Sequence, residues 1–289
     1  MFAAALATPS APPALTDDID SRLSDDELRR IVRLVYERSG ITLHAGKKAL
    51  IVARLQKRLR AGGYSTFSEY LKAVDADPSG AELGALLDAI TTNHTSFFRE
   101  EQHFRVLESH VLPTLTGRAG PIRVWSAACS TGEEPTTLAV TMLEAGADRG
   151  RVRLLASDLS SRALATARAG VYRMDRVAGI PMDLLRRYFE RGLHAQEGLA
   201  RVAPAVRRAI EYRQLNLLEI GDLGERFDVI FCRNVMIYFD RDVQQRVVSM
   251  LERHLAPGGY LFISHSESLN GIAHQLRWVA PAVYRRAQS

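Results

Sequence analysis

The sequence predicts an α/β protein in which an all-helical module precedes a mostly parallel β-sheet covered by helices. Two observations carry this prediction. Up to about residue 90 the apolar residues recur at the three-and-four spacing of amphipathic helices, whereas from residue 120 short β-branched runs alternate with helical stretches. A chain of 289 residues has room for one large domain or two modest ones.

The composition is that of a globular protein. Hydrophobic residues make up 46% and charged residues 25%, which is too apolar for disorder and too charged for an integral membrane protein. The longest apolar runs, such as 2–7 and 49–53, are far shorter than the ~20 residues that cross a bilayer. Residues 1–16 hold three of the 11 prolines and no Lys or Arg, so we expect a flexible tail rather than a secretory signal.

Capping boxes mark helix starts in the first part of the chain. They pair Ser24 with Glu27, Thr66 with Glu69, and Ser79 with Glu82, each ahead of an apolar set with helical spacing. A further helix is expected over residues 46–60, ending at Gly62 and Gly63, with an inner face of Leu50, Ile51, Leu55 and Leu59. Residues 17–90 are therefore expected to form a helical domain.

Short β-branched runs predict the strands that follow. They are residues 122–127, 152–157, 227–232 and 260–264, with 278–284 as a candidate closing strand. Residues 172–213 break the alternation, because they are rich in Arg and contain only short strand-like pieces at 199–202 and 210–213. We expect a small antiparallel insertion there, within a domain of residues 91–289.

Polar residues follow the first two predicted strands, where open α/β sheets bind ligands. Gly132 and the acids Glu133 and Glu134 follow the first strand, and Asp158, 26 positions beyond Gly132, follows the second and suits ribose hydroxyls. Acids at this loop would repel a dinucleotide pyrophosphate, so the pattern favours a cationic nucleoside such as S-adenosylmethionine, with its amino group on Glu133. A plain alternative stays open, in which the two acids only complement a helix N-terminus.

Several segments together resemble a known family. They are TTNHTSFFRE (91–100), VWSAACSTGEEP (124–135), LLASDLS (154–160), LNLL (215–218) and FDVIFCRNVMIYF (227–239). In this order, over about residues 20–285, they resemble the chemotaxis receptor methyltransferases of the CheR type. The resemblance implies a Rossmann-like class I methyltransferase domain with a mostly parallel seven-stranded sheet behind an N-terminal receptor-recognition domain.

The resemblance also implies the residues of the site. Its cofactor contacts correspond here to Asn93, Thr95, Arg99, Glu133, Asp158, Asn216, Leu217, Arg233 and Asn234. Arg99 and Tyr238 are the catalytic candidates, for steering the incoming carboxylate and for packing or hydrogen bonding at the methyl-transfer centre. The implied reaction converts receptor glutamates to γ-glutamyl methyl esters and S-adenosylmethionine to S-adenosylhomocysteine. It needs no general base, because a glutamate with a pKa of about 4.3 is already ionised.

The positive charge is concentrated in one stretch. The net charge is +5, and between Arg38 and Ser68 there are seven basic residues and no acidic one. In most proteins a basic helix face is only exposed to solvent. The family resemblance, however, implies a receptor substrate whose helices are rich in glutamate, and a basic face suits such a partner. Arg54, Lys57 and Arg58 are therefore predicted to dock the substrate. Nucleic acid is disfavoured as a partner. The sequence leaves open whether the insertion also binds a receptor C-terminal tail peptide.

The two cysteines, which lack CxxC or metal-ligand spacing, indicate the reducing cytoplasm, and we expect a monomer that reaches the membrane through its receptor. Cys129 and Cys232 are expected to be buried free thiols, and neither they nor the eight histidines show metal-ligand spacing, so no metal is implied. Trp125 and Trp278 are expected in the core of the sheet domain.

Two other functions stay open at this point. One is a class I methyltransferase acting on nucleic acid or a small molecule, which is disfavoured because the residues after the fourth strand lack the prolines of an NPPY motif. The other is a non-catalytic receptor-binding adaptor, which is disfavoured because Asn93, Arg99, Glu133 and Asp158 are all present.

Overall fold

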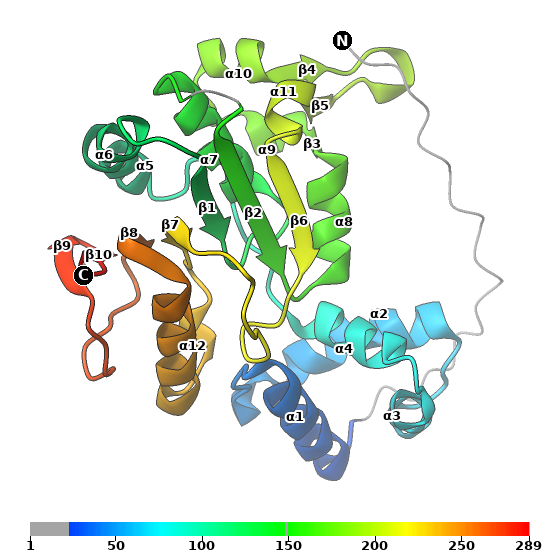
Figure 1. The fold of residues 1–289 in the computed structure, drawn as a ribbon. Helices are drawn as coiled ribbons and strands as arrows, with labels where there is room; N and C mark the ends of the chain where they lie inside the picture. Colours follow the sequence, from blue (N-terminus) through cyan, green and yellow to red (C-terminus); the bar gives the residue numbers. More distant parts are fainter. Residues whose placement is uncertain (1–22, 148–149, 289) are drawn as a thin grey trace. The chain divides into compact units, whose positions relative to one another are not determined.

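The computed structural model describes residues 23–147 and 150–288, so the expected tail of residues 1–16 lies outside the described residues. The chain forms two compact units, one ending at Thr92 and the other beginning at Asn93 (Figure 1). We call them the helical unit and the α/β unit.

The helical unit consists of α1 (Asp25–Ser39), the 3-10 turn η1 (Ala45–Lys47), α2 (Lys48–Gly62), α3 (Phe67–Ala76) and α4 (Ala81–Ile90). The predicted capping box of Ser24 and Glu27 is present, and the Thr66 hydroxyl caps α3 by accepting from the Glu69 N–H. The predicted box of Ser79 and Glu82 is wrong. The Glu82 N–H instead donates to the Asp77 carboxylate at 2.8 Å, because an ionised carboxylate is a stronger acceptor than a hydroxyl.

The inner face of α2 is narrower than the sequence predicted. Ile51, Leu55 and Leu59 are buried at a spacing of four residues, whereas Leu50 is 45% exposed. The assignment of Leu50 to the interior is therefore wrong. The physical reason is that one side chain per turn is enough to reach the small core, and Ile51 takes that place in the first turn.

The α/β unit is built on a seven-stranded sheet with the strand order β6-β2-β1-β7-β8-β10-β9 (Figure 1). Its strands are β1 (Ile122–Ser126), β2 (Val152–Asp158), β6 (Ile210–Gln214), β7 (Phe227–Phe231), β8 (Leu255–Phe262), β9 (Arg277–Ala280) and β10 (Val283–Arg285). The pairs among β6, β2, β1, β7 and β8 are parallel, and β10 is antiparallel to both β8 and β9. The predicted mostly parallel seven-stranded sheet is confirmed.

The C-terminal run forms two strands rather than one. The chain turns at Pro281 and Ala282, so that β10 pairs with β8 while β9 becomes the edge strand. Trp278 on β9 is 65% exposed, and the prediction that it lies in the core is wrong, because an edge strand has no neighbour to cover it. Trp125 on β1 is fully buried as predicted, and its indole N–H donates to the Ser157 hydroxyl at 2.9 Å.

Helices cover the sheet. Three of them follow one another without a break: α5 (Gln102–Val106), the π-turn η2 (Leu107–Val111) and α6 (Leu112–Thr116). The others are α7 (Glu133–Glu144), α8 (Ser161–Ala169) and α12 (Arg241–His254). Helices α7 and α8 contact β2 and β6, and α12 contacts β8. Strands β1 and β7 are buried almost throughout, as expected of parallel strands covered on both faces. Over residues 23–147 and 150–288, no helix combines the length and the hydrophobicity that a membrane crossing needs.

The predicted insertion is a three-stranded antiparallel sheet with the order β3-β5-β4. It contains β3 (Val171–Arg173), α9 (Met174–Val177), α10 (Met182–Tyr188), β4 (Phe189–Arg191), the 3-10 turn η3 (His194–Gln196), β5 (Leu199–Val202) and α11 (Pro204–Arg207). The end of the insertion differs from the expected residue 213. Residues 210–213 belong to β6, which pairs in parallel with β2, because the register sets Ile210 opposite Leu154 in the main sheet.

Candidate functional site

The carboxyl ends of β1, β2 and β6 bring together three of the segments predicted to bind the cofactor. Ser130, in the loop after β1, donates its backbone N–H to the Asp158 carboxylate at 2.7 Å and its hydroxyl to the Asn93 carbonyl at 3.0 Å. The Asp158 carbonyl accepts from the Leu215 N–H at 3.1 Å, next to Asn216 and Leu217. Asn93, Asp158 and the segment after β6 therefore meet around one loop.

Asp158 organises this loop through both of its carboxylate oxygens. Oδ2 accepts from the Ser130 N–H, and Oδ1 accepts from the Ser160 N–H at 2.8 Å. Ser160 in turn caps α8, because its hydroxyl accepts from the Ala163 N–H at 3.0 Å. After β6, the Asn216 side chain accepts from the Leu218 N–H at 3.1 Å, which closes a turn that holds Leu217 half-buried.

Gly132 is a position where only glycine fits. It has a φ of 96° and precedes α7, and a Cβ there would lie 2.8 Å from the Ala167 Cβ and 2.9 Å from the Tyr172 hydroxyl. The Tyr172 hydroxyl donates to the Thr131 carbonyl at 2.7 Å, and burial raises the pKa of Tyr172 well above its ordinary value. The loop is thus held close to α8 and to the insertion, with no side chain at its tightest point.

Glu133 is a buried carboxylate with two partners. It is 1% exposed, and Oε2 accepts from the Thr131 hydroxyl at 2.6 Å. Oε1 forms an ion pair with Arg176 of α9, which also donates to the Thr95 carbonyl at 2.9 Å. Glu133 and Thr95, two predicted cofactor contacts, are therefore joined by an arginine of the insertion. Sequence reasoning missed Arg176, since its only signal was the Arg-rich composition of the insertion.

Arg233, directly after β7, is the centre of a second cluster. It is 5% exposed, its Nε lies 3.5 Å from Glu134 Oε2, and its Nη2 donates to the Arg99 carbonyl. The rings of Phe104 and Phe231 lie 5.5 and 5.7 Å from its guanidinium carbon. Within the part of the chain that the structure describes, Nε and Nη1 have no hydrogen-bond partner.

Glu134 completes this cluster and was given no role from the sequence. Its side chain is 13% exposed, and Oε1 accepts from the Ser126 hydroxyl at 2.7 Å. Burial raises the pKa of Glu134, although the neighbouring Arg233 acts in the opposite direction. The pair is therefore a desolvated one, in which each charge depends on the other.

The two catalytic candidates lie in different surroundings. Arg99 is half-buried, and its Nη1 donates to the His94 carbonyl at 3.0 Å. Tyr238 is half-buried in the 3-10 turn η4 (Met236–Tyr238), and its phenol oxygen has no hydrogen-bond partner among residues 23–147 and 150–288.

Asn234 is held by residues from two other segments. Its φ is 59°, and its side-chain amide donates to the Ser264 hydroxyl at 2.7 Å and to the Glu100 carboxylate at 3.3 Å. Glu100 also accepts from the Ser264 hydroxyl at 2.8 Å and from the His265 N–H at 3.1 Å. Although burial alone would raise the pKa of Glu100, these hydrogen bonds bring it below its ordinary value. Glu100 thus connects the ends of β7 and β8.

Glu100, His103 and His265 form a group whose possible metal-ligand atoms lie within 4.8 Å of one another. Both Glu100 oxygens already accept hydrogen bonds, and the two imidazole rings lie 4.3 Å apart. The guanidinium of Arg233 adds positive charge beside His103. The contacts of Glu100 position Asn234 between the ends of β7 and β8.

His103 predicts a pH dependence of stability. Burial, followed by the charge of Arg233, lowers the pKa of His103 from 6.5 to about 4. The folded state therefore favours the neutral ring, and the unfolded state takes up the proton as the pH falls below 6.5. The stabilisation is complete above pH 6.5 and is lost down to about pH 4, by about 3 kcal/mol in total.

Urea unfolding at several pH values, followed by tryptophan fluorescence, measures this effect. His103→Asn is expected to flatten the loss of stability between pH 6.5 and 4, because carboxylates elsewhere titrate equally in both proteins. His94→Asn, at an exposed position, is the matched control and should keep the wild-type profile. An unchanged profile in His103→Asn would contradict the assignment.

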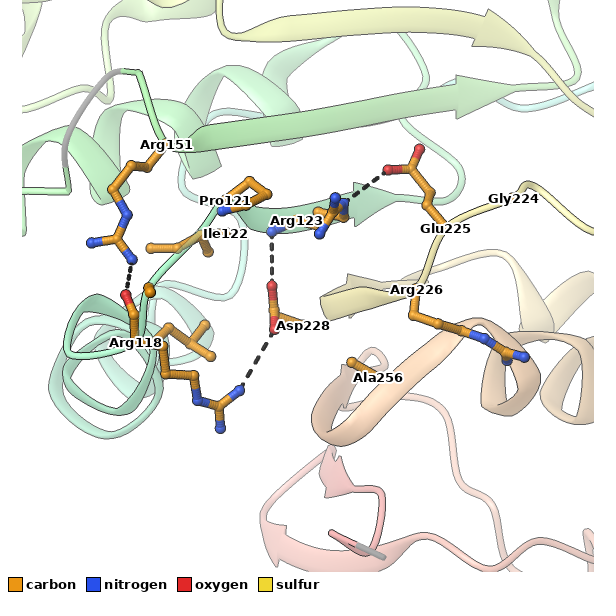
Figure 2. Close-up of a pocket in the computed structure, with 12 residues that line it drawn as sticks. Arg118, Pro121, Ile122, Arg123, Arg151, Gly224, Glu225, Arg226, Asp228 and Ala256 are labelled. Atoms are coloured by element: carbon orange, nitrogen blue, oxygen red, sulfur yellow. Dashed lines mark hydrogen bonds and ion pairs between the residues drawn. The ribbon is translucent and has the colours of Figure 1, made fainter.

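A hollow of about 470 Å³ lies at the other end of the strands, near the amino ends of β1 and β7 (Figure 2). Its lining is tied together by ionic contacts. The Asp228 carboxylate accepts from the Arg123 N–H at 2.9 Å and lies 3.7 Å from the Arg118 guanidinium, while Glu225 lies 3.3 Å from Arg123 (Figure 2). Parallel α/β sheets bind ligands at the carboxyl ends of their strands, so this hollow is not the candidate site.

The substrate-docking candidates Arg54, Lys57 and Arg58 lie on α2 of the helical unit. The other predicted residues lie on segments at the carboxyl ends of the sheet or in the segment that leads from Asn93 to α5. The predicted free thiols are confirmed, since Cys129 and Cys232 are buried and unpaired, and burial raises the pKa of both.

Comparison with known proteins accounts for both units. Residues 26–91 match the model of the CheR methyltransferase all-alpha domain, and residues 93–284 match that of the CheR methyltransferase SAM binding domain. The chemotaxis protein methyltransferase of Salmonella typhimurium is 41% identical over 264 residues, which are 91% of this chain and 90% of the relative. Chemotaxis protein methyltransferase 2 of Pseudomonas aeruginosa is 38% identical over 280 residues, 96% of this chain and 99% of the relative. The chain belongs to the CheR methyltransferase family.

Proposed function

We propose that this protein transfers a methyl group from S-adenosylmethionine to glutamate side chains of membrane chemoreceptors, giving γ-glutamyl methyl esters and S-adenosylhomocysteine. One observation carries the proposal. In a chain of this family, the loop of Gly132 and the carboxylates of Glu133 and Asp158 converge at the carboxyl ends of β1 and β2. The donor set fits the cofactor, because the two acids suit an ammonium and a ribose, and buried Arg233 has donors left for an acceptor.

The chemistry asks the protein for positioning rather than for proton transfer. When bound, S-adenosylmethionine supplies a methyl group activated by its sulfonium. The receptor glutamate is ionised at neutral pH, so the site needs neither a base nor a metal to create the nucleophile. The role proposed for Arg99 is to steer that carboxylate, and the role proposed for Tyr238 is to pack or hydrogen-bond at the centre of transfer. Both act by aligning the reactants and excluding water.

The nature of the labelled product tests the proposal. Receptor-containing membranes incubated with the protein and methyl-labelled S-adenosylmethionine should acquire label that mild alkali releases, because carboxyl esters hydrolyse in base. Base-stable label would indicate the alternative, a methyltransferase with another acceptor. Failure of the purified protein to bind S-adenosylmethionine in calorimetry would indicate a non-catalytic adaptor.

The helical unit is proposed to dock the receptor through α2. Of the three candidate residues, Lys57 is exposed. Arg54 donates to the Ile90 carbonyl and to the Thr92 hydroxyl, and Arg58 forms an ion pair with Glu82. Lys57 therefore offers its charge to an acidic receptor helix most directly, while Arg54 and Arg58 also hold α2 to α4.

Reversing the charge of Lys57 is expected to weaken docking. Lys57→Glu should raise the KM for receptor several-fold and leave the affinity for S-adenosylmethionine unchanged, because the exposed charge of Lys57 is proposed to act on the receptor and not on the cofactor. The effect should shrink at high salt. Lys72→Glu, the same charge change on an exposed residue of α3, is the matched control and should leave the KM unchanged. An equal loss in both variants would contradict docking through α2.

Further partner details belong to the same proposal. We infer that the protein acts as a cytoplasmic monomer and reaches the membrane through its receptor. The antiparallel sheet β3-β5-β4 leaves β4 as an edge, which is a geometry that an extended receptor tail peptide could join as a further strand. Titration of receptor tail peptide into the protein tests this contact, and the absence of binding would remove it.

A further inference from the structure

The ion pair between Arg176 and Glu133 lies within the proposed cofactor site. Glu133 is 1% exposed, whereas the side chain of Arg176 is 41% exposed. Both printed contacts of Arg176, to Glu133 Oε1 and to the Thr95 carbonyl, use the same nitrogen, Nη2. Among the described residues, its Nε and Nη1 donate to no other group. Arg176 therefore holds a buried acid with one nitrogen and has two further nitrogens on a half-exposed side.

The pair constrains what can bind beside it. An ammonium that approaches Glu133 also approaches the guanidinium of Arg176, and two cations in a desolvated site repel each other. A ligand that carries a carboxylate next to its ammonium avoids this cost, because the carboxylate faces the guanidinium while the ammonium faces Glu133. An amino-acid zwitterion, such as the methionine end of S-adenosylmethionine, has this arrangement of charges.

We propose that Arg176 binds the α-carboxylate of the methionine moiety of S-adenosylmethionine and S-adenosylhomocysteine, and that Arg176 and Glu133 together select an amino-acid zwitterion. The inference rests on the proposed function. The guanidinium is suited to this role, because Nη2 keeps its contacts with Glu133 and Thr95 while Nε or Nη1 donates a charge-assisted hydrogen bond to the carboxylate.

Two other roles for Arg176 make different predictions. If Arg176 only neutralised Glu133, its loss would disturb the pocket and weaken every adenosyl ligand alike. If it competed with the incoming ammonium for Glu133, its loss would tighten the binding of S-adenosylhomocysteine. If Arg176 recognises the carboxylate, its loss should lower the binding affinity only for ligands that carry a carboxylate.

Calorimetry on the full-length protein distinguishes these roles without an activity measurement. The probes are S-adenosylhomocysteine, decarboxylated S-adenosylmethionine, which lacks the carboxylate, and methylthioadenosine, which lacks the whole amino-acid end. Arg176→Gln is expected to weaken the binding of S-adenosylhomocysteine by about 10- to 100-fold, which is the effect expected when charge-assisted hydrogen bonds are lost. The affinities for the other two probes should stay at the wild-type values or, for the decarboxylated compound, increase.

Two further variants complete the test. Arg176→Lys keeps the charge beside Glu133 but has one donor nitrogen in place of three, so its loss of affinity should be intermediate. Arg173→Gln removes a neighbouring arginine, 78% exposed and paired with Asp175, and should change no affinity. Equal weakening of all three probes in Arg176→Gln, or tighter binding of S-adenosylhomocysteine, would overturn the inference. If the wild-type protein bound neither S-adenosylmethionine nor its product, the proposed function itself would fail.

Discussion

Replacing Asp158 with asparagine is expected to weaken the binding of S-adenosylmethionine by about 100-fold, which corresponds to two charge-assisted hydrogen bonds at the low end of their range. In the unliganded protein both carboxylate oxygens accept backbone N–H groups, from Ser130 and Ser160. An amide has one acceptor oxygen, so its NH₂ group would face one of these donors. The variant therefore loses both the proposed ribose contact and the acceptor that holds the loop after β1.

Calorimetric titration of S-adenosylmethionine measures this loss. Asp183→Asn, which makes the same chemical change at an exposed position of α10, should bind with the wild-type affinity. Thermal unfolding of the unliganded Asp158 variant separates a loosened loop from a lost ligand contact. An Asp158→Asn protein that bound within about threefold of wild type would show that Asp158 does not contact the cofactor.

Replacing Arg233 with methionine is expected to lower the free energy of unfolding of the α/β unit by about 3–5 kcal/mol, the range for breaking a buried ion pair. Methionine fills part of the space between Phe104 and Phe231 but leaves Glu134, 13% exposed, without its partner. The Arg99 carbonyl also loses a donor. The cost arises mainly from the uncompensated charge, so removing that charge as well should reverse much of it.

Tryptophan fluorescence during urea unfolding follows this effect in one unit only, because the chain has two tryptophans, Trp125 and Trp278, and both lie in the α/β unit. Adding Glu134→Gln to Arg233→Met should restore at least about 1 kcal/mol of the lost free energy of unfolding, as expected for two neighbouring residues whose effects are coupled. Strict additivity of the two single changes would contradict the coupling. Arg241→Met, at an exposed first residue of α12, is a control for the loss of a surface arginine.

Local signals in the sequence were sufficient to predict the main helices and strands and the acidic residues that follow β1 and β2. The capping box of Ser24 and Glu27 involves atoms three residues apart, so its outcome depends little on the rest of the fold. The β-branched runs around β1, β2 and β7 are buried on both faces and leave no competing helical spacing. Residues directly after such strands must lie at one edge of a parallel sheet, which is why Glu133 and Asp158 could be predicted together.

Other features were decided by packing between distant segments. Residues 210–214 have the pattern of a strand, but only pairing with β2 places them in the main sheet rather than in the insertion. Trp278 has the same strand pattern as Trp125, yet it is exposed because β9 is the edge. The sequence of a strand shows which of its residues alternate between buried and exposed faces, but it does not show which strand lies next to it. The order of strands in the sheet is therefore decided by the tertiary structure.

The sequence by itself thus determined the family, the two units and most acids of the candidate site, because motifs and periodicities are local. Only the tertiary structure decided the partners of those acids. Arg176 reaches Glu133 from 43 residues away in the insertion, and Arg233 reaches Glu134 from the end of another strand. The physical reason is that the pairing of a buried charge depends on which segments the fold places beside it, and chain spacing carries no information about that choice.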